Sequence, residues 1–450
     1  MSRRAAGALA AAFTALVLLA TLLPGTERPP DPGAAARLLP EDFLSDAVRN
    51  VLLFLPLGVL LRCAGRRPLG VAGVGAALSS FVEAMQFAVP SRHPSLLDLV
   101  CNTAGTAVGA WLAPRLAELL DPPPPGARRL AQGWAGAVAL FLVAQGPLAT
   151  PALPPLPWHA GVRPEFGHLP VYPGEVIGAR IGDRRLHPGR VEGAGRLREL
   201  VARGAPVVLR ARAGPAPPAG PAPLFTLHGA RQTLALAVGV DGGDLLFEVR
   251  TRARALGLET AAHRAPGLLA GLAPGEPYRV RIEPGRDGAC ATAHLEAREP
   301  PEIRRRCGLG PRPGDGFGFF FYAELPPPAW RPAVGCLWLG LLALPLGFWP
   351  AGARLQGLLV AIVGALVAGV PAVSPLAPAR PAEILAPAAG AAVGRLLRRL
   401  YGRGPKPSRT GDPRPEDRSS SRARPRARPG QPRGAAAEIR EPPQPSGRVW

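Results

Sequence analysis

Eight long apolar segments constrain the fold of this chain more than any other feature of its 450 residues. A bilayer core requires roughly 20 consecutive apolar residues in a helix, and only helices can satisfy the backbone of segments that lack the alternation of barrel strands. The sequence therefore predicts a mainly α-helical polytopic membrane protein. The segments are residues 5–23, 48–61, 69–87, 96–116, 130–148, 333–349, 355–373 and 384–400. Segment 5–23 also fits a cleaved signal peptide, but its length and the spans that follow favour a retained helix.

Basic residues gather in alternate connections and so predict an orientation. Segments 62–68 and 115–129 and the chain after residue 395 are rich in arginine, whereas 88–95 and 374–383 hold only Arg92 and Arg380. The positive-inside rule then predicts a protein of the cell (inner) membrane with both termini on the cytoplasmic side and residues 150–331 on the outer side. The net charge of +21 lies mostly in these connections and the tail, without interleaved aromatic residues. We therefore expect membrane lipids, and no nucleic acid, as partners.

Residues 150–331 form an insert between the fifth and sixth apolar segments, bounded by Pro-rich stretches. Short runs of alternating polarity within it are typical of antiparallel strands and predict an all-β sandwich. Asp241-Gly242-Gly243 predicts a hairpin turn, because glycine accepts the positive φ that such turns require. The predicted strands are 207–213, 232–240, 244–253, 278–283, 289–297 and 317–325.

The apolar segments and the insert define four regions. Residues 1–149 form an N-terminal unit of about five membrane helices, 150–331 the extracytoplasmic domain and 332–401 a unit of about three helices. Residues 402–450 are rich in Pro, Arg, Ser and Gly, so we predict a disordered basic cytoplasmic tail. Cys290 and Cys307 alone lie outside the membrane segments and are a disulfide candidate.

A cluster of polar residues marks the N-terminal unit, and polar groups inside apolar helices are functional candidates because they are costly there. Under the predicted topology all six lie at the outer face, with Arg92 in the short loop and the other five near the ends of adjacent helices. Glu83 and Gln86, and likewise Asp98 and Asn102, share a helix face. The set is Asn50, Glu83, Gln86, Arg92, Asp98 and Asn102.

Three interpretations of this cluster stay open. It is a buried hydrogen-bonded network neutralised by Arg92, a binding site for an anionic or sugar-bearing lipid head group, or an acid/base pair formed by Glu83 and Asp98 as catalytic candidates. No metal-ligand set, phosphate loop or dinucleotide motif accompanies it, so we expect neither metal nor cofactor.

The chain also repeats itself. Residues 104–112 resemble 389–397, and Leu55-Pro56-Leu57-Gly58 recurs as 344–347. We interpret helices two to four and six to eight as parallel copies of one three-helix unit, with small residues that allow close packing. The register that matches Asp98 to Glu383 puts Ala368, Pro371 and Pro387 in the places of Glu83, Gln86 and Asn102. The second copy is therefore predicted to be a structural support.

The polar and glycine positions of the first copy, in their order and spacing, resemble the VanZ-like family of bacterial membrane proteins over roughly residues 10–120. The matching positions are Asn50, Pro56, Gly58, Glu83, Gln86, Arg92, Ser95, Asp98, Asn102, Gly105 and Gly109. The resemblance implies a multi-helix envelope protein, and the family is named for a protein associated with teicoplanin resistance. The insert resembles concanavalin A-like/laminin-G-like sandwiches through residues 223–251.

These observations favour a non-catalytic role over an enzymatic one, namely binding or organising an envelope glycan or lipid. The alternative is a membrane-embedded hydrolase or transferase that acts on a lipid-linked envelope substrate. The repeat favours a transporter as a third hypothesis, but the sequence places no charged residues at the bilayer midplane.

Overall fold

The computed structural model describes residues 2–22, 42–89, 94–165, 169–218, 220–229, 233–285, 287–321, 327 and 329–403. The chain divides into one unit of residues 1–403 and a second of residues 404–450. Arg92 and residues 404–450 of the predicted tail lie outside the described residues, whereas residues 402 and 403 are the last of a helix.

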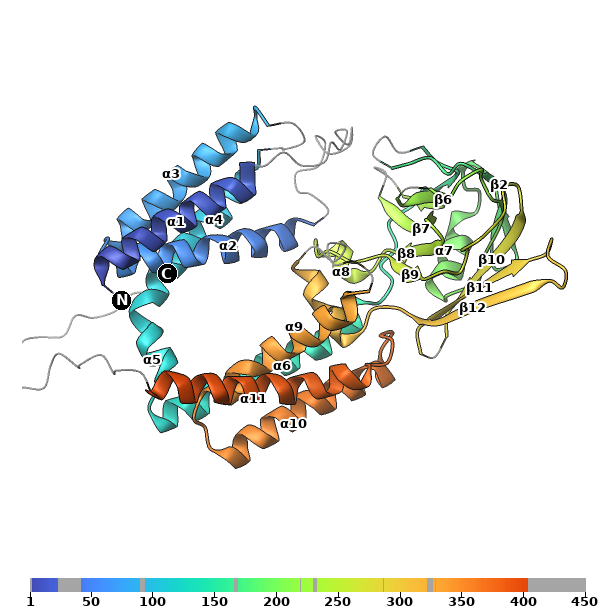
Figure 1. Cartoon of the computed structure of the whole chain (residues 1–450). Coiled ribbons are helices and arrows are strands. Elements are labelled where there is room, and N and C mark those ends of the chain that lie inside the picture. The colour runs from blue at the N-terminus through green and yellow to red at the C-terminus, as the bar shows by residue number, and fades with distance from the viewer. Residues whose placement is uncertain are drawn as a thin grey trace, which may run out of the picture. The chain divides into compact units, whose positions relative to one another are not determined.

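The N-terminal helices pack around a small core of apolar side chains from α1 and α2, chiefly Ala10, Val17, Phe54 and Leu57. Ser95 caps the N-terminus of α4, and Pro68 starts α3 at a position where a missing N–H costs nothing. The elements are α1 (Arg3–Leu22), α2 (Phe43–Cys63), α3 (Pro68–Gln86), α4 (Leu96–Leu112), η2 (Ala113–Arg115) and α5 (Leu116–Leu120). Figure 1 shows α1 to α4 side by side.

A second group of helices shares its own core. Small residues of α6, such as Ala131 and Ala135, pack with Leu339 and Ala343 of α9 and with Val363 of α10. The elements are α6 (Pro124–Leu148), α9 (Arg331–Phe348), α10 (Ala353–Gly369), η5 (Val370–Val373) and α11 (Pro381–Arg403).

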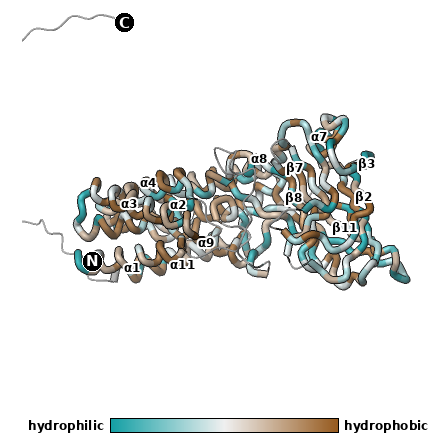
Figure 2. The backbone as a smooth tube through the Cα atoms, turned by 90° about the horizontal axis from the view of Figure 1, so that it is seen from above, coloured by the Kyte–Doolittle hydropathy of each residue, from teal (hydrophilic) through white to brown (hydrophobic). Residues whose placement is uncertain are grey.

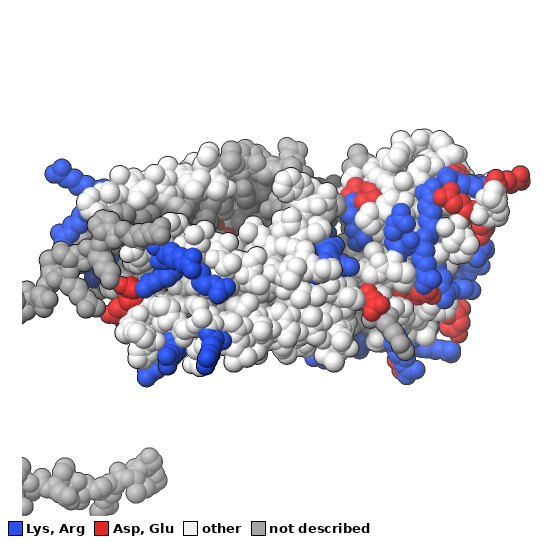
Figure 3. Space-filling view, turned by 60° about the horizontal axis from the view of Figure 1, so that its bottom comes forward, with Lys and Arg blue, Asp and Glu red and all other residues white. Residues whose placement is uncertain are grey.

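Six of the described helices are long and apolar enough to cross a membrane: Arg3–Leu22, Phe43–Cys63, Pro68–Gln86, Leu96–Leu120, Arg331–Phe348 and Ala353–Val373. The predicted spans 130–148 and 384–400 are helical within α6 and α11, but neither helix is among the six. Arginines at one end of each lower their hydropathy, so the count of eight stays a prediction. Hydrophobic residues dominate the helices in Figure 2, and large parts of the helical surface carry no charged group in Figure 3.

Two pairs of helices make closely similar contacts through glycine. A Cβ atom added to Gly58 of α2 would lie 2.0 Å from the carbonyl oxygen of Thr106 on α4, and one on Gly109 would lie 2.1 Å from that of Leu55. The same holds between α9 and α11, where the corresponding distances are 1.8 Å for Gly347 and 2.1 Å for Gly394. Both pairs therefore depend on backbone-to-backbone approach that only glycine permits.

The insert contains, within its described residues, two six-stranded antiparallel sheets ordered β4-β1-β6-β7-β8-β9 and β12-β11-β10-β5-β2-β3. Side chains from both sheets form one hydrophobic core around Trp158, Phe225 and Leu209. The first strands are β1 (His159–Val162), β2 (Glu175–Ile181), β3 (Arg184–Leu186), β4 (Gly189–Arg190), β5 (Val207–Arg212) and β6 (Ala222–His228). The remaining strands are β7 (Leu234–Asp241), β8 (Asp244–Val249), β9 (His263–Ala265), β10 (Pro277–Glu283), β11 (Ala289–Leu295) and β12 (Glu302–Leu309). Helices α7 (Ala194–Ala202) and α8 (Arg252–Ala255) complete the domain.

The predicted hairpin turn joins β7 and β8, where Asp241 pairs with Asp244 and Gly242 has a φ of 58°. Cys290 and Cys307, on the paired strands β11 and β12, form a disulfide with their Cα atoms 4.0 Å apart.

The predicted strand 317–325 is wrong in its described part, because residues 313–319 form the 3-10 helix η4 (Pro313–Phe319). Glycine at every second position weakens a strand. The aromatic side chains there pack elsewhere: Phe319 lies in a core with Ala253 and Leu258, against which Phe141 of α6 packs. The run of aromatic residues thus joins the insert to the helices and adds no strand to a sheet.

Candidate functional site

A polar site forms where α2 begins, α3 ends and α4 begins. In α2, Arg49 is paired with Asp46 and lies 3.8 Å from a carboxylate oxygen of Asp42. Its side chain is only 12% exposed. A nearly buried guanidinium requires such carboxylate partners, because an unpaired charge loses hydration without compensation.

Glu83 and Asp98 are linked through Ser95. A carboxylate oxygen of Glu83 accepts a hydrogen bond of 2.7 Å from the backbone N–H of Ser95, the N-cap of α4, so the end of α3 is tied to the start of α4. The Ser95 hydroxyl in turn accepts from the N–H of Asp98 at 3.4 Å. The charged neighbours of Asp98 are Glu83, Asp46 and Arg49, so this carboxylate lies close to two other carboxylates and to one guanidinium.

The amide members of the predicted cluster make other contacts. Asn102, 4% exposed, donates to the Ser79 hydroxyl at 3.0 Å, while its own amide oxygen is buried and has no hydrogen-bond partner among the described residues. Gln86 donates to the carbonyl oxygen of Thr21 on α1 at 3.5 Å. Asn50 is half-buried, one helical turn after Asp46. The structure thus brings Glu83 and Asp98 together, and it ties Gln86 and Asn102 to neighbouring helices.

Arg92, predicted to be the neutralising cation, lies outside the described residues, so its role stays a prediction. Among the described residues, Arg49 supplies a positive charge near Asp46 and Asp98. Sequence reasoning missed Arg49, Asp46 and Ser95 as members of the site. The available signal was the pair of charged residues Asp46 and Arg49 within the turn before the polar Asn50, at the start of an apolar helix.

The same end of α2 contacts the β domain. The backbone N–H groups of Leu44 and Ser45 donate to the carbonyl oxygen of Gly257 at 2.9 and 3.1 Å. The buried Ser45 hydroxyl donates to the carbonyl oxygen of Phe319 at 2.6 Å and accepts from the N–H of Glu259 at 2.8 Å. These bonds attach the first turn of α2 to two separate segments of the insert.

Glu259 extends the charged site into the β domain, since its carboxylate lies 3.2 Å from a guanidinium nitrogen of Arg49. Burial raises the pKa of Glu259, and the charge of Arg49 acts in the opposite direction. Arg49 therefore pairs with carboxylates of its own helix and of the β domain at once.

The second helix group has a different arrangement at the matching position. Glu383, in the first turn of α11, is fully buried, and its carboxylate accepts from the N–H of Arg380 at 2.9 Å. The turn η4 fills the adjacent space: a Cβ on Gly314 would come within 2.8 Å of a Glu383 oxygen, and one on Gly316 within 2.7 Å of the Gln145 amide nitrogen. No room for a ligand is left at that contact.

The chemistry available at the first site is that of carboxylates, amides and one guanidinium, which bind hydroxyl and phosphate groups and exchange protons. Among the residues that the structure describes, no group of three or more His, Cys, Asp or Glu side chains is arranged to hold a metal ion.

Comparison of the chain with known proteins links the first site to a family. The search of curated proteins gave no match, and the search of solved structures gave none. Residues 10–118, which hold most of α1, all of α2 to α4 and every member of the predicted cluster, match the family model VanZ/LLP1. The N-terminal membrane region of this chain is therefore VanZ-like.

Proposed function

We propose that this multi-pass membrane protein binds or organises a glycan or lipid of the cell envelope at the site around Asp98. The observation that carries the proposal is Asp98, which has Glu83 and the Asp46–Arg49 pair as charged neighbours, at the end of the helices that contacts the β domain. The VanZ/LLP1 match of this region supports a VanZ-like envelope protein linked to glycopeptide resistance.

The kind of ligand follows from the donors and acceptors. Carboxylate and amide groups accept and donate hydrogen bonds to sugar hydroxyls, and a guanidinium binds phosphate oxygens in pairs. The buried amide oxygen of Asn102, which has no partner in the described part of the chain, provides a further acceptor. A lipid-linked sugar presents both hydroxyl and phosphate groups at the depth where a helix end meets the membrane surface.

The β domain supports a location of this site on the outer side. Its Cys290–Cys307 disulfide requires an oxidising compartment. A concanavalin A-like/laminin-G-like domain on that side is suited to envelope glycans, and its two sheets with a common core are compatible with that resemblance. We therefore assign residues 150–331 to the extracytoplasmic side and both termini to the cytoplasm.

The second helix group is proposed to be a degenerate copy of the first. Its glycine contacts repeat those of α2 and α4, and Glu383 takes the place of Asp98. Since η4 covers Glu383, the second copy anchors the β domain and the first keeps its site for a ligand.

An enzymatic function is the second candidate, because Glu83 and Asp98 are electrostatic neighbours. Two carboxylates in one site allow one to act as acid and the other as base in hydrolysis or transfer on a lipid-linked substrate. Binding is preferred, because the site includes no recognised nucleophile motif.

Substitution of Asp98 by Asn tests the proposal, since it keeps the shape of the side chain and deletes its charge. Lipids extracted from the purified protein are identified by mass spectrometry, and its thermal unfolding is measured in detergent. We expect the wild type to retain a defined envelope lipid or lipid-linked glycan, and D98N to lose it while unfolding at an unchanged temperature.

The exposed Glu118 provides the matched control, and E118Q should retain the ligand. A wild type without any specific lipid, together with a lower unfolding temperature for D98N, would reduce the cluster to a structural network. If the wild type co-purifies with a reaction product and D98N with the unreacted substrate, the enzymatic function would be supported instead.

A further inference from the structure

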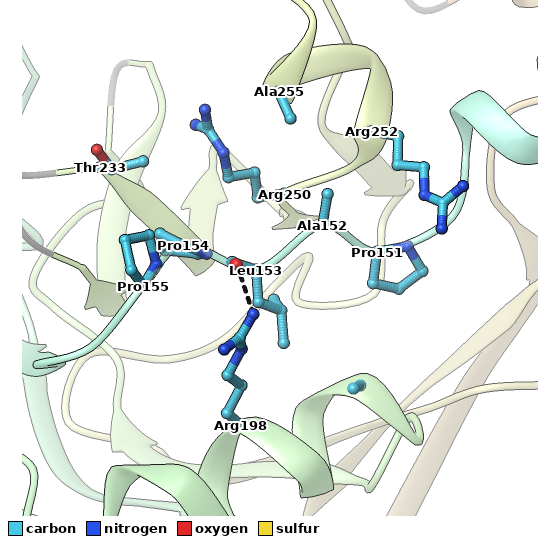
Figure 4. Close-up of a pocket in the computed structure, with 11 residues that line it drawn as sticks. Pro151, Ala152, Leu153, Pro154, Pro155, Arg198, Thr233, Arg250, Arg252 and Ala255 are labelled. Carbon is cyan, nitrogen blue, oxygen red and sulfur yellow. Dashed lines mark hydrogen bonds between the residues drawn. The ribbon is translucent and has the colours of Figure 1, made fainter.

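A cavity of about 610 Å³ lies at the base of the β domain, where the chain leaves α6. Its wall includes the linker residues 151–155, and three arginines from separate segments surround that linker in Figure 4. Arg198 comes from α7, Arg250 follows β8, and Arg252 begins α8. Its volume falls in the range of small-molecule sites.

The cavity is held close to the end of a membrane-region helix. Only Ala149 and Thr150 separate Leu148, the last residue of α6, from Pro151, a distance of at most about 11 Å for an extended chain. The N–H of Arg252 donates to the carbonyl oxygen of Thr150 at 2.9 Å, and the N–H of Ala152 donates to that of Arg250 at 2.9 Å. Because α6 packs along α9 and α10, two candidate spans, the cavity lies near the membrane surface.

The charge of the lining has one sign. Among the described residues that line the cavity, three are arginines and none is acidic. Arg198 donates one hydrogen bond of 3.4 Å to the carbonyl oxygen of Leu153, and its side chain, like that of Arg252, is exposed. Proline, alanine and leucine make up most of the rest of the wall, so a ligand meets guanidinium groups and apolar surface together.

We propose that this cavity binds the phosphate ester of an anionic lipid head group in the leaflet on the side of the β domain. Guanidinium groups bind phosphate oxygens through charge-assisted, often bidentate hydrogen bonds. Arginines near an anionic bilayer are also attracted to its surface. The apolar wall at the linker accommodates the glycerol and upper acyl carbons. The site would set the position of the β domain on the membrane, and it shares no residue with the Asp98 cluster.

The test uses the full-length protein in detergent, titrated with phosphatidylglycerol or phosphatidylcholine, with bound lipid counted by native mass spectrometry. The variant R198Q/R252Q removes two exposed charges of the cavity. We expect it to bind phosphatidylglycerol about tenfold more weakly than the wild type, as the loss of charge-assisted bonds implies. The control R185Q/R190Q removes two exposed arginines of the same domain outside the cavity and should bind as the wild type does.

A separate arm identifies the source of the phosphate. Glycerol 3-phosphate is added to the same proteins and thermal unfolding is followed. If glycerol 3-phosphate competes with phosphatidylglycerol in the wild type but not in R198Q/R252Q, the cavity is a phosphate site that also binds free phosphate esters. Equal phosphatidylglycerol binding by R198Q/R252Q and R185Q/R190Q overturns the proposal, as does wild-type binding of phosphatidylcholine with the same affinity. D98N should leave this lipid binding unchanged, so its result separates this site from the proposed function.

Discussion

At the scale of single residues, Arg49 links the first helix group to the β domain through ion pairs. It is 12% exposed, contacts Asp46 on its own helix, and reaches Glu259 of the β domain at 3.2 Å. Removing one partner of such a buried pair leaves the opposite charges uncompensated.

Replacing Arg49 by Met should therefore destabilise the protein by about 3–5 kcal/mol, because Asp46, Asp98 and Glu259 lose their cation. Thermal unfolding in detergent measures the effect. R196Q is the control, since Arg196 and Asp183 form an exposed pair worth about 0–1 kcal/mol. Equal stability of R49M and R196Q would contradict the importance of the pair.

His263 should give the β domain a dependence on pH. Its ring packs against Phe247 with the ring centres 4.9 Å apart, and burial lowers its pKa to about 4 from an ordinary 6.5. Between these values the unfolded chain binds a proton that the folded domain does not. Stability should thus fall as pH drops through 6.5 and level off near 4, by about 3 kcal/mol in total.

Chemical denaturation at several pH values measures this slope. H263F should remove most of it, whereas H187N, which replaces an exposed histidine, should retain it. An unchanged slope in H263F would assign the acid sensitivity to other groups.

At the scale of elements, the sequence predicted the membrane helices better than the strands. Long apolar runs have few alternatives in a bilayer, so all eight segments lie in helices. Strands β5, β10 and β11 show alternation and start at or within one residue of their predicted positions. The strand β6 is buried at nearly every position and has no alternation, and β12 has three consecutive arginines, so neither gives a period-two signal.

The glycine contacts allow a test at this scale. G109A adds a Cβ that would lie 2.1 Å from the carbonyl oxygen of Leu55, so α2 and α4 must separate. We expect a loss of about 1–3 kcal/mol in unfolding free energy. If the two helix pairs are copies, G394A should cost a similar amount.

Gly133 of α6 is the control, because a Cβ there meets nothing within 4 Å. G133A should leave the unfolding temperature unchanged or raise it slightly, since alanine favours helix. A harmless G109A together with a harmful G133A would refute the role of close approach.

At the scale of the whole molecule, the candidate site was only partly predictable. Glu83 and Asp98 were found because polar groups are conspicuous in apolar helices. The contacts of Ser45 and Arg49 with residues 257–259 and 319 were not found, because they join positions more than 200 residues apart. Pairings over such distances leave no periodic pattern in a sequence.

The proposed topology is tested by labelling single cysteines in intact cells with a membrane-impermeant maleimide. The free cysteines Cys63, Cys101 and Cys336 are first replaced by alanine. R185C, at an exposed position of β3, should be labelled, and S420C in the tail should react only after the membrane is permeabilised. The reverse pattern would put the β domain in the cytoplasm.

The ion pair of Arg49 with Glu259 also sets an order of events during biosynthesis. At 5–20 residues per second, the ribosome reaches Glu259 about 10–40 s after Arg49 has been made. Asp42 and Asp46 are translated before Arg49 and lie within one or two helical turns of it. They therefore neutralise Arg49 until Glu259 has been synthesised. The nascent N-terminal helices can thus reside in the bilayer with their arginine neutralised. Docking of the newly folded β domain then completes the charge pairing, so the finished contact forms only in a chain whose helices and β domain have both folded.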